Sequence, residues 1–312
     1  MAKHRVGIVG AGQVGVAGAF ALFVQDVCSE LVLVDIDKKR AHGEALDLMH
    51  GQGYAGRITV QDGDYDLLAG CQVVIITAGA AQKPGETRLD LLNKNAAIFR
   101  SIAAELDRHA PDAVIIVASN PVDILTYIMQ ELSARPPEKV IGTGTMLDTS
   151  RFRSLLGDYY HVDPKSVHGY ILGEHGDTEF AAWSTVTIGG KSPVGAGILG
   201  RPWNQADMDK LFDQVKNAAY EIIEGKGYTN WAIGLVISRL VDIILDDRCS
   251  VQPVSSRLVD DYGISGVCLS LPTRVGMNGV EGHVHLHLDP DERTALERSA
   301  AVMAKAIGEV EI

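Results

Sequence analysis

The first half of this chain alternates short apolar runs with segments of helical periodicity, and this alternation constrains its fold most strongly. The runs are short and uniformly apolar, which is typical of strands buried on both faces of a sheet. The separating segments have apolar residues every three to four positions, as crossover helices between parallel strands do. The expected strands are Arg5–Val9, Leu31–Asp35, Val73–Thr77, Ala113–Ala118 and Lys139–Gly142, and the expected helices are Gln13–Val27, Lys38–His50, Thr87–His109 and Val122–Leu132. Residues 1–142 are therefore expected to form an α/β domain with a doubly wound sheet of five or six parallel strands.

The second half, residues 143–312, has a different pattern of expected helices and strands. Longer helices are expected over Ala206–Gly225 and Trp231–Asp246, with strands over Trp183–Ile188 and Val267–Leu271. This mixture predicts an α+β domain. No linker separates the halves, so we expect a shared interface with the active site between them. A last helix is expected after Asp289, which is a favourable N-cap and is followed by Pro290.

Three glycines, Gly10, Gly12 and Gly15, lie between the first expected strand and the first expected helix. The first permits a tight turn, the second lets a pyrophosphate approach the backbone, and the third packs the helix against the strand. The helix N-terminus directs unpaired N–H groups at a phosphate. Asp35 ends the next strand, twenty residues after Gly15, where it accepts from a ribose hydroxyl and repels a 2′-phosphate. These features predict a Rossmann domain that binds NAD, and a glycine turn without a ligand is the alternative.

The composition limits the partners and the location of the chain. A formal net charge of -12 argues against nucleic-acid and anionic-membrane partners, because both need clustered Lys and Arg. The uncharged run from Val6 to Val24 is similar to a signal peptide, but its glycines disfavour an apolar helix, so export is not expected. No CxxC pair occurs among the four cysteines, and we expect free, buried thiols in a reducing cytoplasm. These are Cys28, Cys71, Cys249 and Cys268.

A histidine between glycines, His175, follows an apolar stretch and is a candidate proton carrier. Hydride transfer to a carbonyl also needs a proton, and imidazole exchanges one near neutral pH. Asp148 and Arg151 are three residues apart, so they share one side of a helical turn if a helix begins there. Beside His175, the carboxylate would fix the imidazole tautomer and the guanidinium would bind a substrate carboxylate. From spacing alone, a loop histidine and a solvated ion pair stay open as alternatives.

Three histidines near the C-terminus, His283, His285 and His287, alternate with apolar residues. They would share one face of a strand. A metal site is not expected, because no acidic or cysteine partner lies nearby in the sequence. We expect a strand with an apolar core face and a polar outer face.

Taken together, these motifs resemble the lactate/malate dehydrogenase family over nearly the whole chain, and its bacterial lactate-specific members in particular. The resemblance implies that His175 transfers the proton, that Asp148 orients its ring and that Arg151 binds the substrate carboxylate. Arg88, on a loop from Ala78 that we expect to close as a lid, would polarise the reacting carbonyl. The segments that carry the resemblance are VGIVGAGQVG, LVLVDID, ITAGAAQKPGETRLDLLNKN, ASNPVDILTY, GTGTMLDTSRFR, SVHGYILGEHGDTE and EGKGYTNWAIG.

The cofactor contacts implied by the resemblance come from the ends of several strands. Asn120 would lie near both the nicotinamide and the substrate. The implied NAD-binding residues are Gly10, Gly12, Gln13, Val14, Gly15, Asp35, Ala78, Gly79, Ser119 and Asn120.

The choice between lactate and malate depends on Gln82. Family members that use oxaloacetate carry arginine at this position, because a second carboxylate in a closed site needs a cation. Gln82 is neutral, and Thr229 and Ile233 fit the small apolar-walled pocket of lactate-specific members. The implied reaction is a reversible hydride transfer between NADH and pyruvate that gives L-lactate. A malate dehydrogenase and an NAD-binding protein without activity are the alternatives.

Arg153 and His168 match two residues that bind fructose 1,6-bisphosphate across a subunit interface in many bacterial members of the family. Both side chains can be cationic, as a bisphosphate site requires. Ordinary surface roles are the alternative. The resemblance thus implies activation by fructose 1,6-bisphosphate and a homotetramer.

Overall fold

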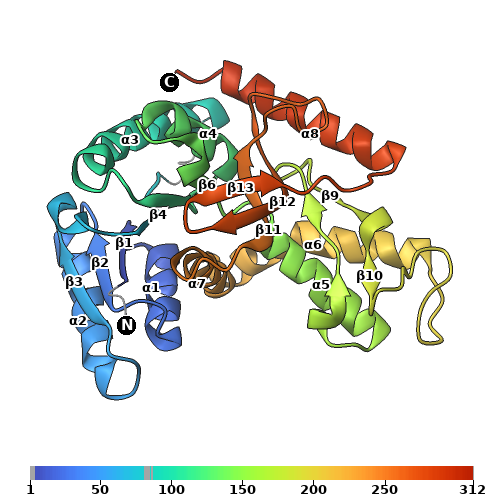
Figure 1. Ribbon diagram of the computed structural model, residues 1–312, viewed down its shortest axis with the longest axis horizontal. Helices are drawn as coiled ribbons and strands as arrows, with labels where there is room; N and C mark the ends of the chain where they lie inside the picture. The colour runs from blue at the N-terminus through green and yellow to red at the C-terminus, as the bar shows by residue number, and fades with distance from the viewer. Residues whose placement is uncertain (1–3, 81–84, 86, 312) are drawn as a thin grey trace.

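The computed structural model describes residues 4–80, 85 and 87–311, without the side chain of Arg88. Figure 1 shows two parts side by side: parallel strands between layers of helices, and a second part of antiparallel strands and longer helices. Among the described residues, nine strands form one sheet that runs through both parts in the order β13-β12-β11-β6-β5-β4-β1-β2-β3. The fold is thus a Rossmann-type parallel sheet followed by a domain of helices and antiparallel strands, which confirms the expected α/β and α+β halves.

The strands of the first part all run parallel to their neighbours. The chain winds outward in both directions from β1, which pairs with β2 on one side and β4 on the other. In such sheets the crevice at the carboxyl ends of the two central strands is where ligands bind. The bounds are β1 Arg5–Val9, β2 Glu30–Val34, β3 Thr59–Gly63, β4 Val73–Ile76, β5 Val114–Val117 and β6 Val140–Gly142.

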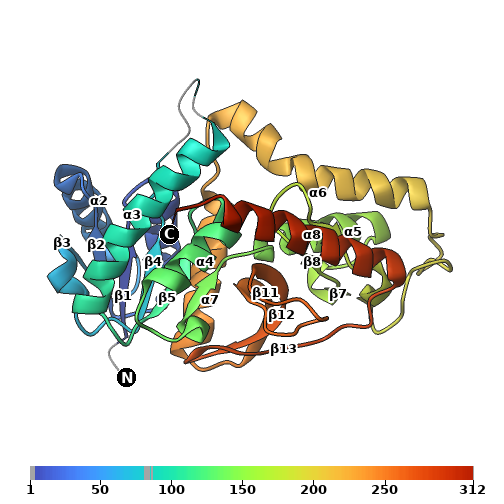
Figure 2. The same cartoon turned by 90° about the horizontal axis from the view of Figure 1, so that it is seen from above.

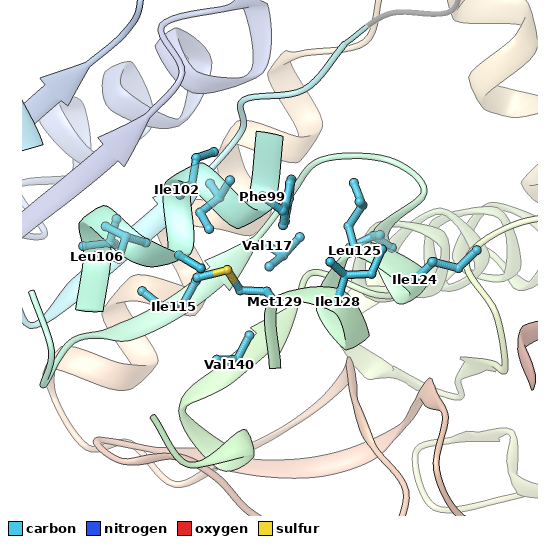
Figure 3. Close-up of a cluster of buried hydrophobic side chains, with 14 of the residues drawn as sticks. Phe99, Ile102, Leu106, Ile115, Val117, Ile124, Leu125, Ile128, Met129 and Val140 are labelled. Atoms are coloured by element: carbon cyan, nitrogen blue, oxygen red, sulfur yellow. The ribbon is translucent and has the colours of Figure 1, made fainter. Parts of the chain in front are cut away.

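Helices cover both faces of these strands because successive strand residues point to opposite sides. Ile8 belongs to the core shared with α1, α2 and α7, whereas its neighbour Val9 belongs to the core shared with α3 and α4. Figure 3 shows the second of these cores, where Phe99 of α3 and Leu125 of α4 pack near Val117 of β5. Each fully buried side chain of this size contributes about 1.5–3 kcal/mol to stability. The helices are α1 Gln13–Gln25, α2 Lys38–His50, α3 Arg88–His109 and α4 Val122–Leu132.

The second part extends the same sheet through antiparallel strands. β11 joins β6 through the pairing of Ser255 with Gly142, and β12 and β13 follow outward. In Figure 2, the long helices α6 and α8 extend along this part. Its elements are α5 Met146–Tyr160, β7 Val167–His168, β8 Ile171–Leu172, β9 Phe180–Ala181, β10 Thr187–Ile188, α6 Gln205–Lys226, α7 Trp231–Leu245, β11 Ser250–Arg257, β12 Cys268–Gly276, β13 Gly279–His283 and α8 Pro290–Gly308.

The expected start of the last helix is confirmed by its hydrogen bonds. The Asp289 carboxylate accepts from the backbone N–H groups of Asp291 and Glu292, and the Glu292 side chain accepts from the Asp289 N–H in return. This reciprocal cap satisfies N–H groups that the helix itself leaves unpaired.

Two predicted strands are wrong in part. The run Trp183–Ile188 contains a 3₁₀ helix, Trp183–Thr185, before the short β10, because the Trp183 ring packs edge-on against Phe152 and Trp203. The strand expected through His287 ends at His283.

At the end of β13, the carboxylate of Asp261 contacts two of the three histidines. Asp261 Oδ2 lies 2.9 Å from His283 Nδ1, and Asp261 Oδ1 lies 2.7 Å from His285 Nε2. The acidic partner of these histidines is therefore distant in the sequence and lies in the loop between β11 and β12.

Three of the four thiols are buried as expected, and all four are free. Cys249 is exposed, so the expectation of burial is wrong there. It lies in the turn after α7, where Asp247 and Cys249 itself adopt left-handed backbone conformations at the surface. None of the helices in the described ranges is long and apolar enough to span a bilayer.

Candidate active site

The glycine-rich turn between β1 and α1 is shaped for close approach by a ligand. Gly10 has a φ of 108°, and a Cβ there would lie 2.6 Å from the backbone nitrogen of Ala78. A Cβ at Gly15 would clash with the carbonyl oxygen of Gly10. A Cβ at Gly12 would meet no heavy atom of the described residues within 4 Å. The backbone at Gly12 is thus open to a pyrophosphate at the N-terminus of α1.

Asp35 is held beside this turn by two backbone groups. Its Oδ2 accepts from Ala11 N at 2.6 Å, and its Oδ1 accepts from Asp37 N at 2.8 Å. Each carboxylate oxygen keeps a second lone pair, so the group can still accept from a ribose hydroxyl. The residues present therefore fit a dinucleotide.

The loops after β4 and β5 complete this edge of the sheet. The Ser119 hydroxyl donates to the carbonyl oxygen of Ala78 at 2.7 Å, which ties the two loops together. Gly79 and Asn120 are exposed beside them, as are Gln13 and, in part, Val14 on α1. The structure thus brings the described members of the predicted NAD set to one edge.

The imidazole of His175 lies against the first turn of α5. Its Nδ1 is 2.6 Å from Asp148 Oδ2, while Arg151 Nη1 donates to Asp148 Oδ1 at 2.8 Å. Asp148 is only 2% exposed. The carboxylate is therefore shared between a ring and a guanidinium in a buried place, which excludes the solvated ion pair that spacing alone left open.

Two elements hold the backbone of the His175 loop. The His175 N–H donates to Asp123 Oδ2 of α4 at 2.7 Å, and the Glu174 N–H donates to the Ser299 hydroxyl of α8 at 2.7 Å. Asp123 and Ser299 are buried. Neither residue is predicted from the sequence, although Asp123 follows Asn120 closely within the same motif.

Buried carboxyl groups set the proton affinity of His175. Burial lowers the pKa of the imidazole, but the charge and hydrogen bond of Asp148, with the charges of Asp123 and Glu179, outweigh this and raise the pKa to about 9. Burial raises the pKa of Asp148, yet His175 and Arg151 hold it below its ordinary value. At neutral pH the pair is an imidazolium beside a carboxylate. The Nδ1–H of His175 donates to Asp148, so Nε2 carries the proton that the ring can transfer.

These groups open into a cavity of about 720 Å³ between α3, the start of α4, α5 and α6. The cavity is large enough for a small organic acid beside a nicotinamide. The polar residues that line it include Asn120, Asp148, Arg151, His175, Glu179 and Lys216.

The remaining residues that the sequence predicts for the site do not line this cavity or lie outside the described part of the chain. Thr229 and Ile233 are half-buried at the start of α7 and are not among the described residues that line the cavity. Gln82 and the side chain of Arg88 lie outside the described residues. Glu179 and Lys216 are not predicted from the sequence, where only the position of Glu179, four residues after His175, indicates that it lies near the site.

Comparison with known proteins decides the family. Residues 4–142 match the model of the lactate/malate dehydrogenase NAD binding domain, and residues 145–311 match that of the lactate/malate dehydrogenase alpha/beta C-terminal domain. The chain belongs to the lactate/malate dehydrogenase family. It is therefore an oxidoreductase, and the prediction of NAD as its cofactor is confirmed.

Several members of this family are similar over almost their full length. The L-lactate dehydrogenase of Salinibacter ruber is 53% identical over 96% of each chain, and that of Synechococcus sp. is 46% identical over 97% of this chain and 98% of its own. The crystal structure of minor L-lactate dehydrogenase from Enterococcus mundtii in the ligands-bound form has a TM-score of 0.96 at 43% identity and covers 99% of both chains.

Proposed function

We propose that this chain catalyses the reversible hydride transfer between NADH and pyruvate that gives L-lactate. One observation carries the proposal: an imidazolium fixed by a buried carboxylate shares a cavity with a guanidinium, beside a turn that fits a dinucleotide. The names of the similar L-lactate dehydrogenases support the same substrate.

The charged residues of the site have separate roles in this reaction. Arg151 binds the carboxylate of pyruvate, which leaves the keto oxygen to accept the proton of His175. Asp148 keeps the ring in the tautomer that carries this proton on Nε2 and stabilises the imidazolium. Arg88, by resemblance, stabilises charge on the oxygen as its loop excludes water. In the reverse direction neutral His175 removes the proton from the hydroxyl of lactate.

The cofactor would be held by the edge of the parallel sheet. NAD supplies the hydride donor or acceptor for this chemistry when it is bound. The turn from Gly10 to Gly15 would receive the pyrophosphate, and Asp35 the adenosine ribose. Ala78, Gly79, Ser119 and Asn120 would line the nicotinamide side. We also propose residues 1–142 as the NAD-binding domain and 143–312 as the substrate domain.

The oxidation of NADH, followed by absorbance with pyruvate and with oxaloacetate, tests this function. We expect a kcat/KM for pyruvate about 10³-fold above that for oxaloacetate, because Gln82 leaves a second carboxylate without a cation. Faster turnover of oxaloacetate would identify a malate dehydrogenase. Binding of NADH without turnover of either acid would identify a non-catalytic protein.

Activation by fructose 1,6-bisphosphate is a separate proposal, which rests on Arg153 and His168. Arg153 donates to the carbonyl oxygen of Gly169 at 3.0 Å and stacks over the Tyr170 ring, so its guanidinium lies beside the backbone of exposed His168. A guanidinium and an imidazole on adjoining segments suit a phosphate, and a symmetry mate would supply the second pair. A homotetramer in the cytoplasm, acting in fermentation after glycolysis, belongs to the same proposal.

Steady-state kinetics with the bisphosphate check this proposal. The apparent KM for pyruvate is expected to fall about tenfold when fructose 1,6-bisphosphate is added. The double variant Arg153→Gln/His168→Gln should lose the response, whereas Lys165→Gln, which removes a nearby exposed charge, should keep it. Identical kinetics of the parent with and without the bisphosphate would refute the proposal.

A further inference from the structure

Glu179 is a buried carboxyl group that the chemistry described so far does not use. It lies directly before β9, lines the cavity and is only 6% exposed. Glu179, Asp148 and His175 each place one ligand-type atom within 4.8 Å of the others. Glu179 Oε1 is buried and makes no hydrogen bond to any residue that the structure describes. Burying such an oxygen is costly, so its place beside the reacting imidazole calls for a role.

Charged groups face this carboxyl from each element packed around it. Asp148 is a neighbour with like charge, which opposes ionisation of Glu179, whereas His175, Lys216 and Arg151 favour it. Lys216 is held in place because its Nζ donates to the carbonyl oxygen of Asp177 at 2.9 Å. The other titratable groups of the described neighbourhood are Asp123 on α4, Glu174 and Asp177 on the His175 loop, and Asp213 and Tyr220 on α6.

We propose that Glu179 is a positioning residue for the reaction: its buried carboxyl, balanced by Lys216 of α6, adjusts how firmly His175 holds the proton that it transfers. This inference rests on the proposed function, because it assigns Glu179 a part in the same proton transfer. Glu179 acts through His175 and not on the substrate.

Glu179 and His175 titrate over overlapping pH ranges, so the effect of Glu179 on the pKa of His175 has a definite sign. Burial and the charge of Asp148 raise the pKa of Glu179 to about 8. Below this pH Glu179 is a neutral acid, and above it the carboxylate favours the imidazolium of His175. As the pH rises, the new negative charge appears just before His175 would lose its proton, so the imidazolium persists to higher pH.

The test is the pH profile of pyruvate reduction by the NADH-saturated enzyme, from about pH 6 to about pH 10. In the parent, kcat/KM should fall above the His175 pKa of about 9. Glu179→Gln keeps the size of the side chain and stays neutral, so the alkaline fall should move down by about 0.5–1 pH unit, with rates below pH 7 unchanged. At about pH 9, where the parent is itself half deprotonated, this shift corresponds to a loss of about two- to fivefold relative to the parent.

Two further variants distinguish an effect of Glu179 on the pKa of His175 from a purely structural role of its side chain. Glu179→Asp keeps an ionisable carboxyl, so its alkaline fall should lie closer to the parent than that of Glu179→Gln. Asp209→Asn removes the same charge from an exposed position on α6 and should not move the fall. A structural role alone predicts that Glu179→Gln loses rate equally at all pH values, and that result would overturn the proposal.

An infrared titration of the parent enzyme keeps the proposal testable if Glu179→Gln does not fold. The band of a protonated carboxyl group should persist above pH 7 and disappear around pH 8. Its absence at neutral pH would also overturn the proposal. This measurement needs no turnover, so it separates a failure of this inference from a failure of the proposed lactate chemistry.

Discussion

Replacing His175 with asparagine is expected to lower kcat for pyruvate reduction about 10³- to 10⁴-fold. Asparagine cannot carry a proton, and water would have to supply it in the confined cavity. The affinity for NADH should stay within about twofold, because no hydrogen bond links His175 to the glycine-rich turn among the described residues. Stopped-flow absorbance and NADH fluorescence measure the two quantities.

The control for this change is His287→Asn, which alters an exposed histidine that does not line the cavity. It should leave kcat unchanged. If His175→Asn retained kcat within tenfold of the parent, the assignment of the proton to this imidazole would be wrong. Loss of NADH binding together with turnover would instead point to a collapsed site.

Changing Gln82 to arginine is expected to raise the ratio of kcat/KM for oxaloacetate to that for pyruvate by about 10³-fold or more. Oxaloacetate carries a second carboxylate, and bringing it into a closed cavity without a partner is costly. Of the described cations of the cavity, Arg151 would bind the first carboxylate, and Lys216 donates to the Asp177 carbonyl. A new guanidinium would supply the missing charge.

The matched control is Gln82→Met, which keeps a similar length without a charge. It should leave the poor turnover of oxaloacetate unchanged, so that any gain in the arginine variant is due to charge. Initial rates with both acids at saturating NADH give the ratio. A Gln82→Arg enzyme that preferred pyruvate by the original margin would show that Gln82 does not determine the choice of substrate.

Much of the parallel sheet was predictable because its signals are local. The bounds of β1, α2 and α4 agree with the apolar pattern residue by residue. β3, Thr59–Gly63, was missed because an edge strand alternates polar residues, and Gln61 and Asp62 interrupt the apolar run. The pairing of Ser255 with Gly142 joins residues far apart in the sequence, which local pattern does not encode.

The residues of the site also differ in whether local sequence predicts them. Sequence spacing placed Asp148 and Arg151 on one helical turn, and the family resemblance attached His175 to them. The contact of Asp123 with the His175 backbone depends on how α4 meets a loop of the other domain. The burial of Glu179 depends on the packing around it, so neither its raised pKa nor its nearness to the ring is visible in the sequence.

The continuous sheet has a mechanical consequence. The edge that fits the cofactor and the strands β6, β11 and β12 belong to one hydrogen-bonded sheet, and α5, which bears Asp148, begins just after β6, where Thr145 N donates to Ser270 Oγ of β12. Such a framework resists hinge bending between the halves, so opening and closing fall to local segments such as the expected lid. The glycine-rich turn after β1 and the Asp148–His175 pair are therefore expected to keep their relative positions while such segments move.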